Sequence, residues 1–174
     1  MMINSEAFFK VTYGLYIVCS GKGTVLNGFI ANSVFQVSSD PPKFAVSCNK
    51  DNKTAEIMRE SNAFSISVLE RDTPVEIIQL FGYKSGRDIN KFDGIDYIRG
   101  ETGVPVVTSN TVAWFECKLT GSFNVGTHDL YIGELVASDL LQDKGEPLAY
   151  DYYRNVKKGF APKINIQRIT IKRF

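Results

Sequence analysis

The sequence predicts a mainly β protein built around an antiparallel barrel. Several segments alternate apolar and polar residues with the period of two that is typical of strands, and Ala63–Leu69 shows this most clearly. Only two short segments have helical character, and Gly, Pro and Asn-Gly signals separate the strands. Many strands with few helices favour an antiparallel barrel over a parallel α/β sheet.

The first third of the chain contains three apolar runs that predict strands. Gly14–Ser20 is rich in β-branched and aromatic residues, and a turn at Gly21–Gly23 separates it from a long run over Val25–Ser39. Asp40-Pro41-Pro42 ends that run, because proline lacks the amide that a strand ladder needs. Lys43–Ser47 is the next predicted strand.

Two helices are predicted. Asn52–Asn62 places its less polar residues on one face and its charged residues on the other. The second helix follows Thr73-Pro74, with Thr73 as the cap, Glu76 reaching back to it, and Gly82 as the stop after Phe81.

The second half is predicted to contain a long loop and two long strands. Tyr83–Gly103 is polar and contains glycine, so we expect a loop with one short strand near Tyr97. Thr111–Thr120 and Asp129–Ser138 are the long strands. We expect one domain over residues 1–155 and a basic tail over residues 156–174.

Composition restricts the functional class. The 174 residues carry 20 basic and 19 acidic side chains, and a net charge of +1 argues against broad nucleic-acid binding. No apolar run is long enough to span a membrane, and the N-terminus does not resemble a signal peptide. Cys19, Cys48 and Cys117 are widely spaced, which predicts buried free thiols and a cytoplasmic location.

Common catalytic templates are missing. The single histidine, His128, rules out a multi-histidine metal site. There is no G-x-S-x-G elbow, no P-loop and no G-x-G-x-x-G turn. No metal site is therefore expected.

A phosphate site is suggested at the junction between Asn49 and Thr54. The first amides of a helix lack partners within the helix and favour anions, and Lys50 and Lys53 add positive charge. A plain N-cap by Asn52 with solvated lysines explains the same residues.

Three further segments contain residues suited to ligand binding. Ser85–Phe92 supplies Arg87 and Lys91, which suit phosphate, although a solvated loop is the alternative. Small and polar residues interrupt the strand at Gly28–Val34, which suits either the edge of a flat heterocycle or a bulge. His128 beside Asp129 is either a ligand contact or an ordinary surface histidine.

The order of these segments resembles the flavin-reductase-like family with the FMN-binding split barrel. Within that family, the chain is most similar to flavoredoxin and to the flavin domain of high-molecular-weight rubredoxins. The similar stretches cover about Phe9 to Arg154. They are NGFIANSVFQVSSDPPKFAVSCNKDNKT, AFSISVL, FGYKSGRDINKF, TGVPVV, AWFECKL, GTHDLYIGEL and PLAYDYYR.

The resemblance implies a six-stranded antiparallel barrel of Greek-key type with short helical insertions. It also implies a homodimer with non-covalent FMN near the subunit interface. His128 is implied to lie on the nicotinamide side of the flavin. The implied cofactor-binding residues are Ile30, Ala31, Asn32, Ser33, Val34, Ser47, Cys48, Asn49, Lys50, Asn52, Thr54, Ser85, Arg87 and Lys91.

The chain departs from the rubredoxin-linked relatives after Lys157-Lys158-Gly159. No pair of C-x-x-C motifs follows, so we expect any one-iron acceptor, such as a rubredoxin, to be a separate protein. The isoleucine-rich end over residues 163–174 suits an added strand or a poorly ordered end.

Three functions follow from these patterns. The first is an NAD(P)H-dependent flavin reductase that uses FMN. The second is a flavoredoxin-type electron carrier with no nicotinamide-dependent turnover of its own. The third, from another class, is a binding module such as a heme-utilisation or pyridoxamine-phosphate-oxidase-like barrel.

Overall fold

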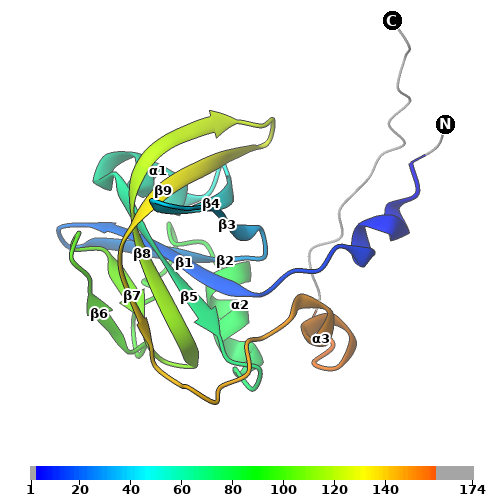
Figure 1. Cartoon of the computed structure of the whole chain (residues 1–174). Helices are drawn as coiled ribbons and strands as arrows, with labels where there is room; N and C mark the ends of the chain where they lie inside the picture. The colour runs from blue at the N-terminus through cyan, green and yellow to red at the C-terminus, as the bar shows by residue number, and fades with distance from the viewer. Residues whose placement is uncertain (1–2, 160–174) are drawn as a thin grey trace, which may run out of the picture.

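Seven antiparallel strands form the main sheet of the computed structural model, which describes residues 3–159 (Figure 1). Their order across the sheet is β2-β1-β5-β8-β9-β4-β3. The strands are β1 (Tyr16–Lys22), β2 (Val25–Ala31), β3 (Val34–Ser39), β4 (Pro42–Asn49), β5 (Ala63–Leu69), β8 (Thr111–Asn124) and β9 (His128–Leu140). A separate pair joins β6 (Tyr97–Arg99) to β7 (Pro105–Val107).

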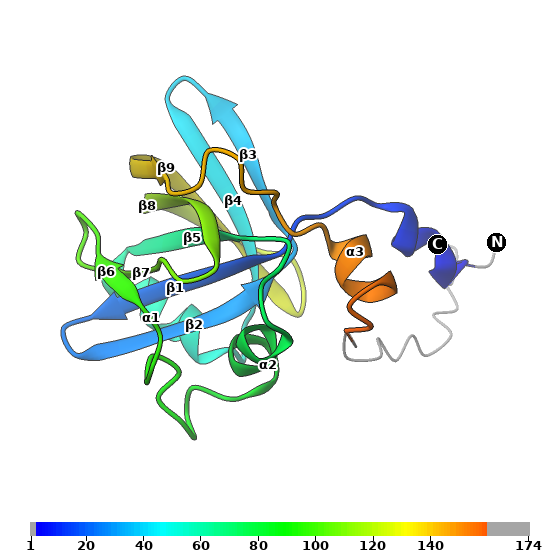
Figure 2. The same cartoon turned by 90° about the horizontal axis from the view of Figure 1, so that it is seen from below.

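The two edge strands of this sheet are neighbours in sequence. β2 and β3 lie at opposite ends of the strand order, yet only Asn32 and Ser33 connect them. A sheet whose edges are joined by two residues must curl until those edges meet, which produces a split barrel. The β1–β2 and β3–β4 hairpins diverge from this meeting point (Figure 2). The predicted fold class is therefore confirmed.

The strand count and lengths differ from expectation. The run over Val25–Ser39 contains two strands because the chain passes from one sheet edge to the other at Asn32-Ser33. This raises the count in the main sheet from the expected six to seven. β8 extends to Asn124, beyond the predicted end at Thr120, because the polar residues there still pair with β9.

Helix α1 (Lys53–Ser61) follows β4 and packs on β1 and β2. The Asn52 side chain caps its first turn, and Asn62 ends it in the left-handed region with φ of 55°. Buried Ala55 and Met58 contribute to a core cluster that also contains Val18, Phe29 and Phe64. The predicted helix over Asn52–Asn62 is confirmed.

Helix α2 (Val75–Tyr83) covers the opposite face of the sheet, where Ile78 and Phe81 pack with Ile17 and Leu69. The predicted Thr73 cap is wrong. The buried Thr73 hydroxyl donates instead to the carbonyls of Glu70 and Asn110, and it makes no cap bond. The helix also continues through Gly82, which does not end it.

A 3₁₀ helix, η1 (Ser5–Lys10), and α3 (Tyr150–Asn155) lie side by side at one end of the barrel (Figure 1). The Arg154 guanidinium lies 3.7 Å from the centre of the Phe9 ring. Lys157 of the predicted tail donates to the Thr73 carbonyl. Residues 160–174 of that tail lie outside the described residues.

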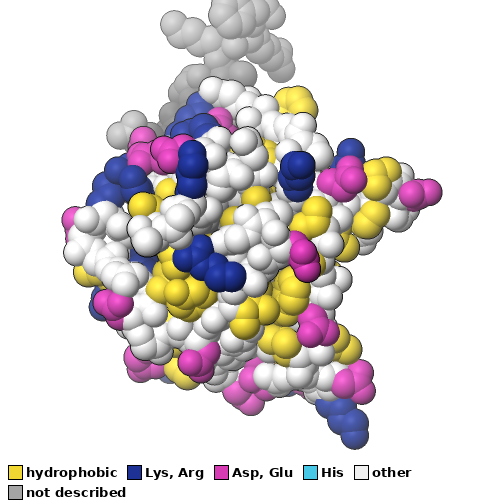
Figure 3. All heavy atoms as spheres, turned by 90° about the vertical axis from the view of Figure 1, so that its left-hand side faces the viewer, with side chains coloured by type: hydrophobic (Ala, Val, Ile, Leu, Met, Phe, Trp, Pro, Cys, Tyr) yellow, Lys and Arg dark blue, Asp and Glu magenta, His cyan; other side chains and the backbone are white. Residues whose placement is uncertain are grey.

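The three cysteines are buried free thiols, as predicted. Within residues 3–159, no helix is long and apolar enough to cross a membrane. The face shown in Figure 3 carries interspersed acidic and basic side chains and no continuous basic field.

Candidate functional site

A cavity of about 420 Å³ opens where β2 passes into β3. Four segments that are distant in sequence surround it: the end of β2, the end of β4, the start of α1 and the β8–β9 turn. The lining residues are Phe29, Ile30, Ala31, Asn32, Ser33, Ser47, Asn49, Asn52, Val125 and His128. The curl of the sheet therefore brings two of the predicted segments and the predicted histidine to one place, whereas the Ser85–Phe92 segment does not line this cavity.

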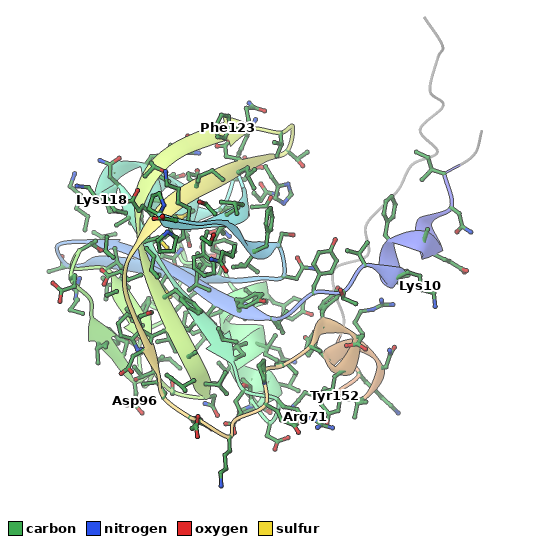
Figure 4. The ribbon with its side chains drawn as sticks, in the orientation of Figure 1. Lys10, Arg71, Asp96, Lys118, Phe123 and Tyr152 are labelled. Atoms are coloured by element: carbon green, nitrogen blue, oxygen red, sulfur yellow. The ribbon has the colours of Figure 1, made fainter. Side chains whose placement is uncertain are left out.

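A second hollow, of about 630 Å³, lies between Glu70–Asp72 and residues 142–146. In its wall, Arg71 pairs with Glu146 and lies 4.4 Å from the centre of the Tyr152 ring. Figure 4 shows Arg71 and Tyr152 next to each other at this end of the molecule. The cavity at the β2–β3 junction is the better candidate because it gathers residues from the predicted segments.

Asn32 and Ser33 lie between β2 and β3 and belong to neither strand. The Ser33 carbonyl accepts from the Ser47 amide at 3.1 Å, and the Ser33 hydroxyl donates to Asn32 Oδ1 at 3.1 Å. These polar groups lie against the apolar side chains of Phe29 and Ile30 in the same cavity. A wall of this kind suits a flat ring with polar edges. Val34 begins β3 and packs against the core instead.

Asn52 caps the start of α1, as the sequence suggests. Asn52 Oδ1 accepts from the Thr54 amide at 3.0 Å, and Asn49 Oδ1 accepts from the Asp51 amide at 2.9 Å. The lysines are paired rather than solvated: Lys50 Nζ lies 3.9 Å from Asp129 Oδ1, and Lys53 donates to Glu56. The amides of Asp51 and Thr54, which the sequence suggested as anion-binding groups, therefore already have partners within the chain.

The Thr54 hydroxyl is different. It is fully buried and has no hydrogen-bond partner within the described part of the chain. An unpaired buried hydroxyl is unfavourable, so a bound group with oxygen acceptors would relieve that cost. Thr54 does not line the cavity, but it lies two residues after Asn52, which does, so its hydroxyl is the candidate phosphate contact in this turn.

The loop that carries Arg87 lies beside α1. The Arg87 guanidinium pairs with the Glu56 carboxylate, and the Ser85 hydroxyl accepts from the Arg87 amide at 3.1 Å. Hydrogen bonds from Arg87, and then from Lys53, lower the pKa of Glu56 to about 2. The structure thus brings the two predicted phosphate-binding segments together, with a carboxylate between them.

Lys91 and Cys48 are placed differently from expectation. The Lys91 ammonium is buried and donates to the carbonyls of Gly28 and Phe81, both at 3.0 Å, so it does not line the cavity. The Cys48 side chain lies in the core, where burial raises the pKa of its thiol to about 12. Only the backbone of Cys48 is near the site.

His128 is half-buried at the start of β9, opposite Asn49 in the strand pairing. Its Nδ1 lies 2.8 Å from the Thr127 hydroxyl. Phe29 and Val125 also line the cavity, although neither was among the implied cofactor-binding residues; Phe29 lies within the predicted Gly28–Val34 segment. Phe29 directly precedes the predicted ring-binding stretch, and Val125 lies in the turn with His128, so proximity in sequence was the available signal.

The fold is an antiparallel split barrel with a ring-sized cavity at its strand junction, and the start of a helix suited to phosphate lies next to that cavity. This combination defines a class of flavin-binding proteins. Residues 8–158 match the family described as "Flavin reductase like domain". The chain belongs to this family.

Two relatives share nearly half of their aligned residues with the chain. A high molecular weight rubredoxin of Moorella thermoacetica is 46% identical, with 92% of this chain and 70% of the relative aligned. A protein of Archaeoglobus fulgidus named "Ferric-chelate reductase (NAD(P)H)" is 47% identical, with 91% and 93% aligned.

Solved structures share the fold. The NADH:FAD oxidoreductase of Streptomyces globisporus C-1027 matches with a TM-score of 0.75 and 26% identity, over 82% of this chain and 83% of that one. An FMN-binding protein from Thermus thermophilus matches with a TM-score of 0.71 and 26% identity, over 79% of each chain. The family resemblance read from the sequence is thereby confirmed.

Proposed function

We propose that the chain binds FMN non-covalently in the cavity at the β2–β3 junction and passes electrons from NAD(P)H to an acceptor. One observation carries the proposal: the cavity is lined both by Asn32 and Ser33 and by the α1 cap Asn52. Asn52 lies two residues before Thr54, whose hydroxyl has no partner within residues 3–159. A ring and its phosphate tail need these two features at one site. Bound flavin would supply the redox chemistry.

The chain's own residues would bind and orient that cofactor. The backbone from Ile30 to Ser33 would lie along the ring, and Ser47, Asn49 and Asn52 would face the ribityl chain. The Thr54 hydroxyl, Ser85 and Arg87 would hold the phosphate. Cys48 would contribute backbone only.

The choice of FMN over FAD rests on the family resemblance read from the sequence. The similar structures include one named for FAD and one named for FMN. Titration of flavin-free protein with FMN and with FAD, followed by flavin fluorescence, tests the choice. A lower dissociation constant for FAD would contradict it.

His128 would lie on the nicotinamide side, as the family resemblance implies, because it lines the cavity from the β8–β9 turn. Steady-state oxidation of NADH and of NADPH with added FMN tests the reductase activity. No turnover with either nucleotide would refute it and leave the carrier function.

A flavoredoxin-type carrier is the second candidate. One relative is named as a high molecular weight rubredoxin, which supports a one-iron protein as an electron partner. Retention of flavin through gel filtration would favour a carrier over an exchanger of free flavin. Transfer of electrons from the reduced protein to oxidised rubredoxin, followed by the bleaching of rubredoxin absorbance, would test the partner.

We also propose a homodimer with the flavin near its interface. Phe123 and Val125 at the β8–β9 turn are 60% and 58% exposed, and Phe35 on β3 is 53% exposed. Figure 4 shows Phe123 on the hairpin that projects from the barrel. Val125 also lines the cavity, so a second copy on this surface would cover the site. The buried free thiols support a cytoplasmic location.

A further inference from the structure

We propose that Lys91 is a positioning residue, which fixes the loop Ser85–Lys91 onto the edge strand β2 and so places Arg87 at the phosphate end of the flavin site. This inference rests on the proposed function. It assigns Lys91 a role through the loop and not through contact with the flavin. Three observations support it.

The first observation is the double anchor of the ammonium. Lys91 is 3% exposed, and its Nζ donates to the Gly28 carbonyl on β2 and to the Phe81 carbonyl on α2. Among the strands of residues 3–159, β2 lies at an edge, and no strand there pairs with the outer side of Gly28. The ammonium therefore satisfies an edge carbonyl and a carbonyl near the end of a helix, where a positive charge is favourable.

The second observation is the packing at the other end of the loop. A Cβ on Gly86 would overlap the carboxamide of Asn27, so the two residues are in close contact. Asn27 and Gly28 are adjacent on β2, and adjacent strand residues point to opposite faces of a sheet. The loop is therefore held to β2 at two adjacent residues, through the side chain of Asn27 and the backbone carbonyl of Gly28.

The third observation is what this anchoring positions. Arg87 follows Gly86 directly and pairs with Glu56 on α1. β2 continues into Ile30 and Ala31, which line the cavity. One strand thus carries both the wall for the ring and the anchors of the phosphate loop, so the two halves of the site keep a fixed separation.

The same geometry explains why a charged lysine lies in the core. Phe92, the next residue, is buried and packs edge-to-face on Phe81 and on Tyr97. This packing seals the ammonium from water, with the Cys19 thiol of β1 as the nearby titratable group. Burying a charge is unfavourable unless it is hydrogen-bonded, and here its two carbonyl partners offset part of that penalty.

The test compares Lys91→Met with Lys91→Arg and with the control Lys84→Met. Lys84 is an exposed lysine just before the loop, so its replacement removes the same charge without removing a buried contact. Dissociation constants are measured for FMN and for riboflavin, which lacks the phosphate. Trypsin cleavage after Arg87 in flavin-free protein reports the order of the loop.

We expect Lys91→Met to weaken FMN binding about tenfold, through loss of a preorganised loop, and to change riboflavin binding less than about twofold. Cleavage after Arg87 should accelerate. Lys91→Arg should recover most of the FMN affinity, and Lys84→Met should behave like the native protein.

An FMN dissociation constant unchanged by Lys91→Met, or equal losses for FMN and riboflavin, would overturn the inference while native FMN binding still supported the proposed function. Failure of the native protein to bind either flavin would refute the proposed function itself. Should Lys91→Met not fold, Gly86→Ala tests the other anchor with Lys91 intact. The same selective loss of FMN affinity is expected, and its absence would refute the inference.

Discussion

The Asn52 carboxamide accepts a hydrogen bond from the Thr54 amide, whereas the buried Thr54 hydroxyl has no partner in the described part of the chain. The cap therefore satisfies the backbone of this turn but not its side chain. A ligand oxygen near the first turn of α1 would provide the hydrogen-bond acceptor that the Thr54 hydroxyl lacks. This relationship gives the sharpest prediction about the flavin site.

Thr54→Val should weaken FMN binding while leaving the flavin-free protein at least as stable as the native one. Valine keeps the volume of threonine and removes the unpaired hydroxyl, so flavin-free protein loses no hydrogen bond. Loss of a bond to a charged phosphate should cost roughly 1.5–3 kcal/mol of binding free energy. FMN titration and thermal unfolding measure the two effects. Thr54→Ser, which keeps the hydroxyl, should bind FMN normally, and equal affinity of both variants would contradict the assignment.

Glu56→Gln should tighten FMN binding by at least about twofold, because it removes a negative charge beside the phosphate and releases Arg87 from its partner. The pKa of Glu56 is held near 2 by Arg87 and Lys53, so the carboxylate is ionised at neutral pH. Arg87→Gln should have the opposite effect on affinity. Titrations at low and high salt measure both changes. Weaker FMN binding by Glu56→Gln would show that the ion pair itself is needed.

Lys91 should make the native protein gain stability relative to Lys91→Met as the pH rises above 8. Burial lowers the pKa of Lys91 to about 8 from its ordinary 10.5. Between these values the unfolded chain binds more protons than the folded one, so the free energy of unfolding increases with pH.

The gain from Lys91 is present above the unfolded pKa and is lost as the pH falls towards 8. Buried Cys19, Cys48 and Cys117 act in the opposite direction, because burial raises the pKa of each thiol. The free energies of unfolding of the native protein and of Lys91→Met are measured in urea from pH 7 to 10. Their difference gives the contribution of Lys91 alone, because the cysteines are the same in both proteins. Parallel curves for native protein and variant would contradict the shift.

Glu116→Gln should destabilise the barrel with little effect on flavin binding. The buried Glu116 carboxylate accepts from the amides of Glu101 and Thr102, at 2.8 and 2.6 Å, and from the Thr102 hydroxyl. Replacing one acceptor oxygen by a donor should cost about 1.5–3 kcal/mol in the free energy of unfolding. Urea denaturation measures it. The control Glu134→Gln removes an exposed ion pair with Lys43 and should cost less than about 1 kcal/mol.

Phe123→Asp should convert the proposed dimer to a monomer and weaken flavin retention. A charge in the centre of an apolar interface is strongly unfavourable. Light scattering after gel filtration measures the mass. Leu140→Asp, at the far end of β9 and equally exposed, is the control and should stay dimeric. A dimeric Phe123→Asp protein would place the interface elsewhere.

The sequence by itself determined the local elements and much of the site. Alternation over Ala63–Leu69 predicts a strand, and Asn52 before a helical pattern predicts a cap; both are found. The structure buries both faces of that strand, because the Ser65 and Ser67 hydroxyls donate to carbonyls of β7. The segments at Ile30–Ser33, Asn49–Asn52 and His128, which the sequence singled out, line one cavity.

Only the tertiary structure decided the places of Lys91, Thr73 and the Asn32-Ser33 connection. A lysine in a polar loop gives no sign that its ammonium will bond to carbonyls of β2 and α2, because those partners come from other parts of the chain. Likewise, the Thr73 hydroxyl does not cap α2, because it donates to the carbonyls of Glu70 and Asn110. Periodicity and caps depend on neighbours a few residues away, whereas burial and buried hydrogen bonds depend on which distant strands the closed barrel brings together.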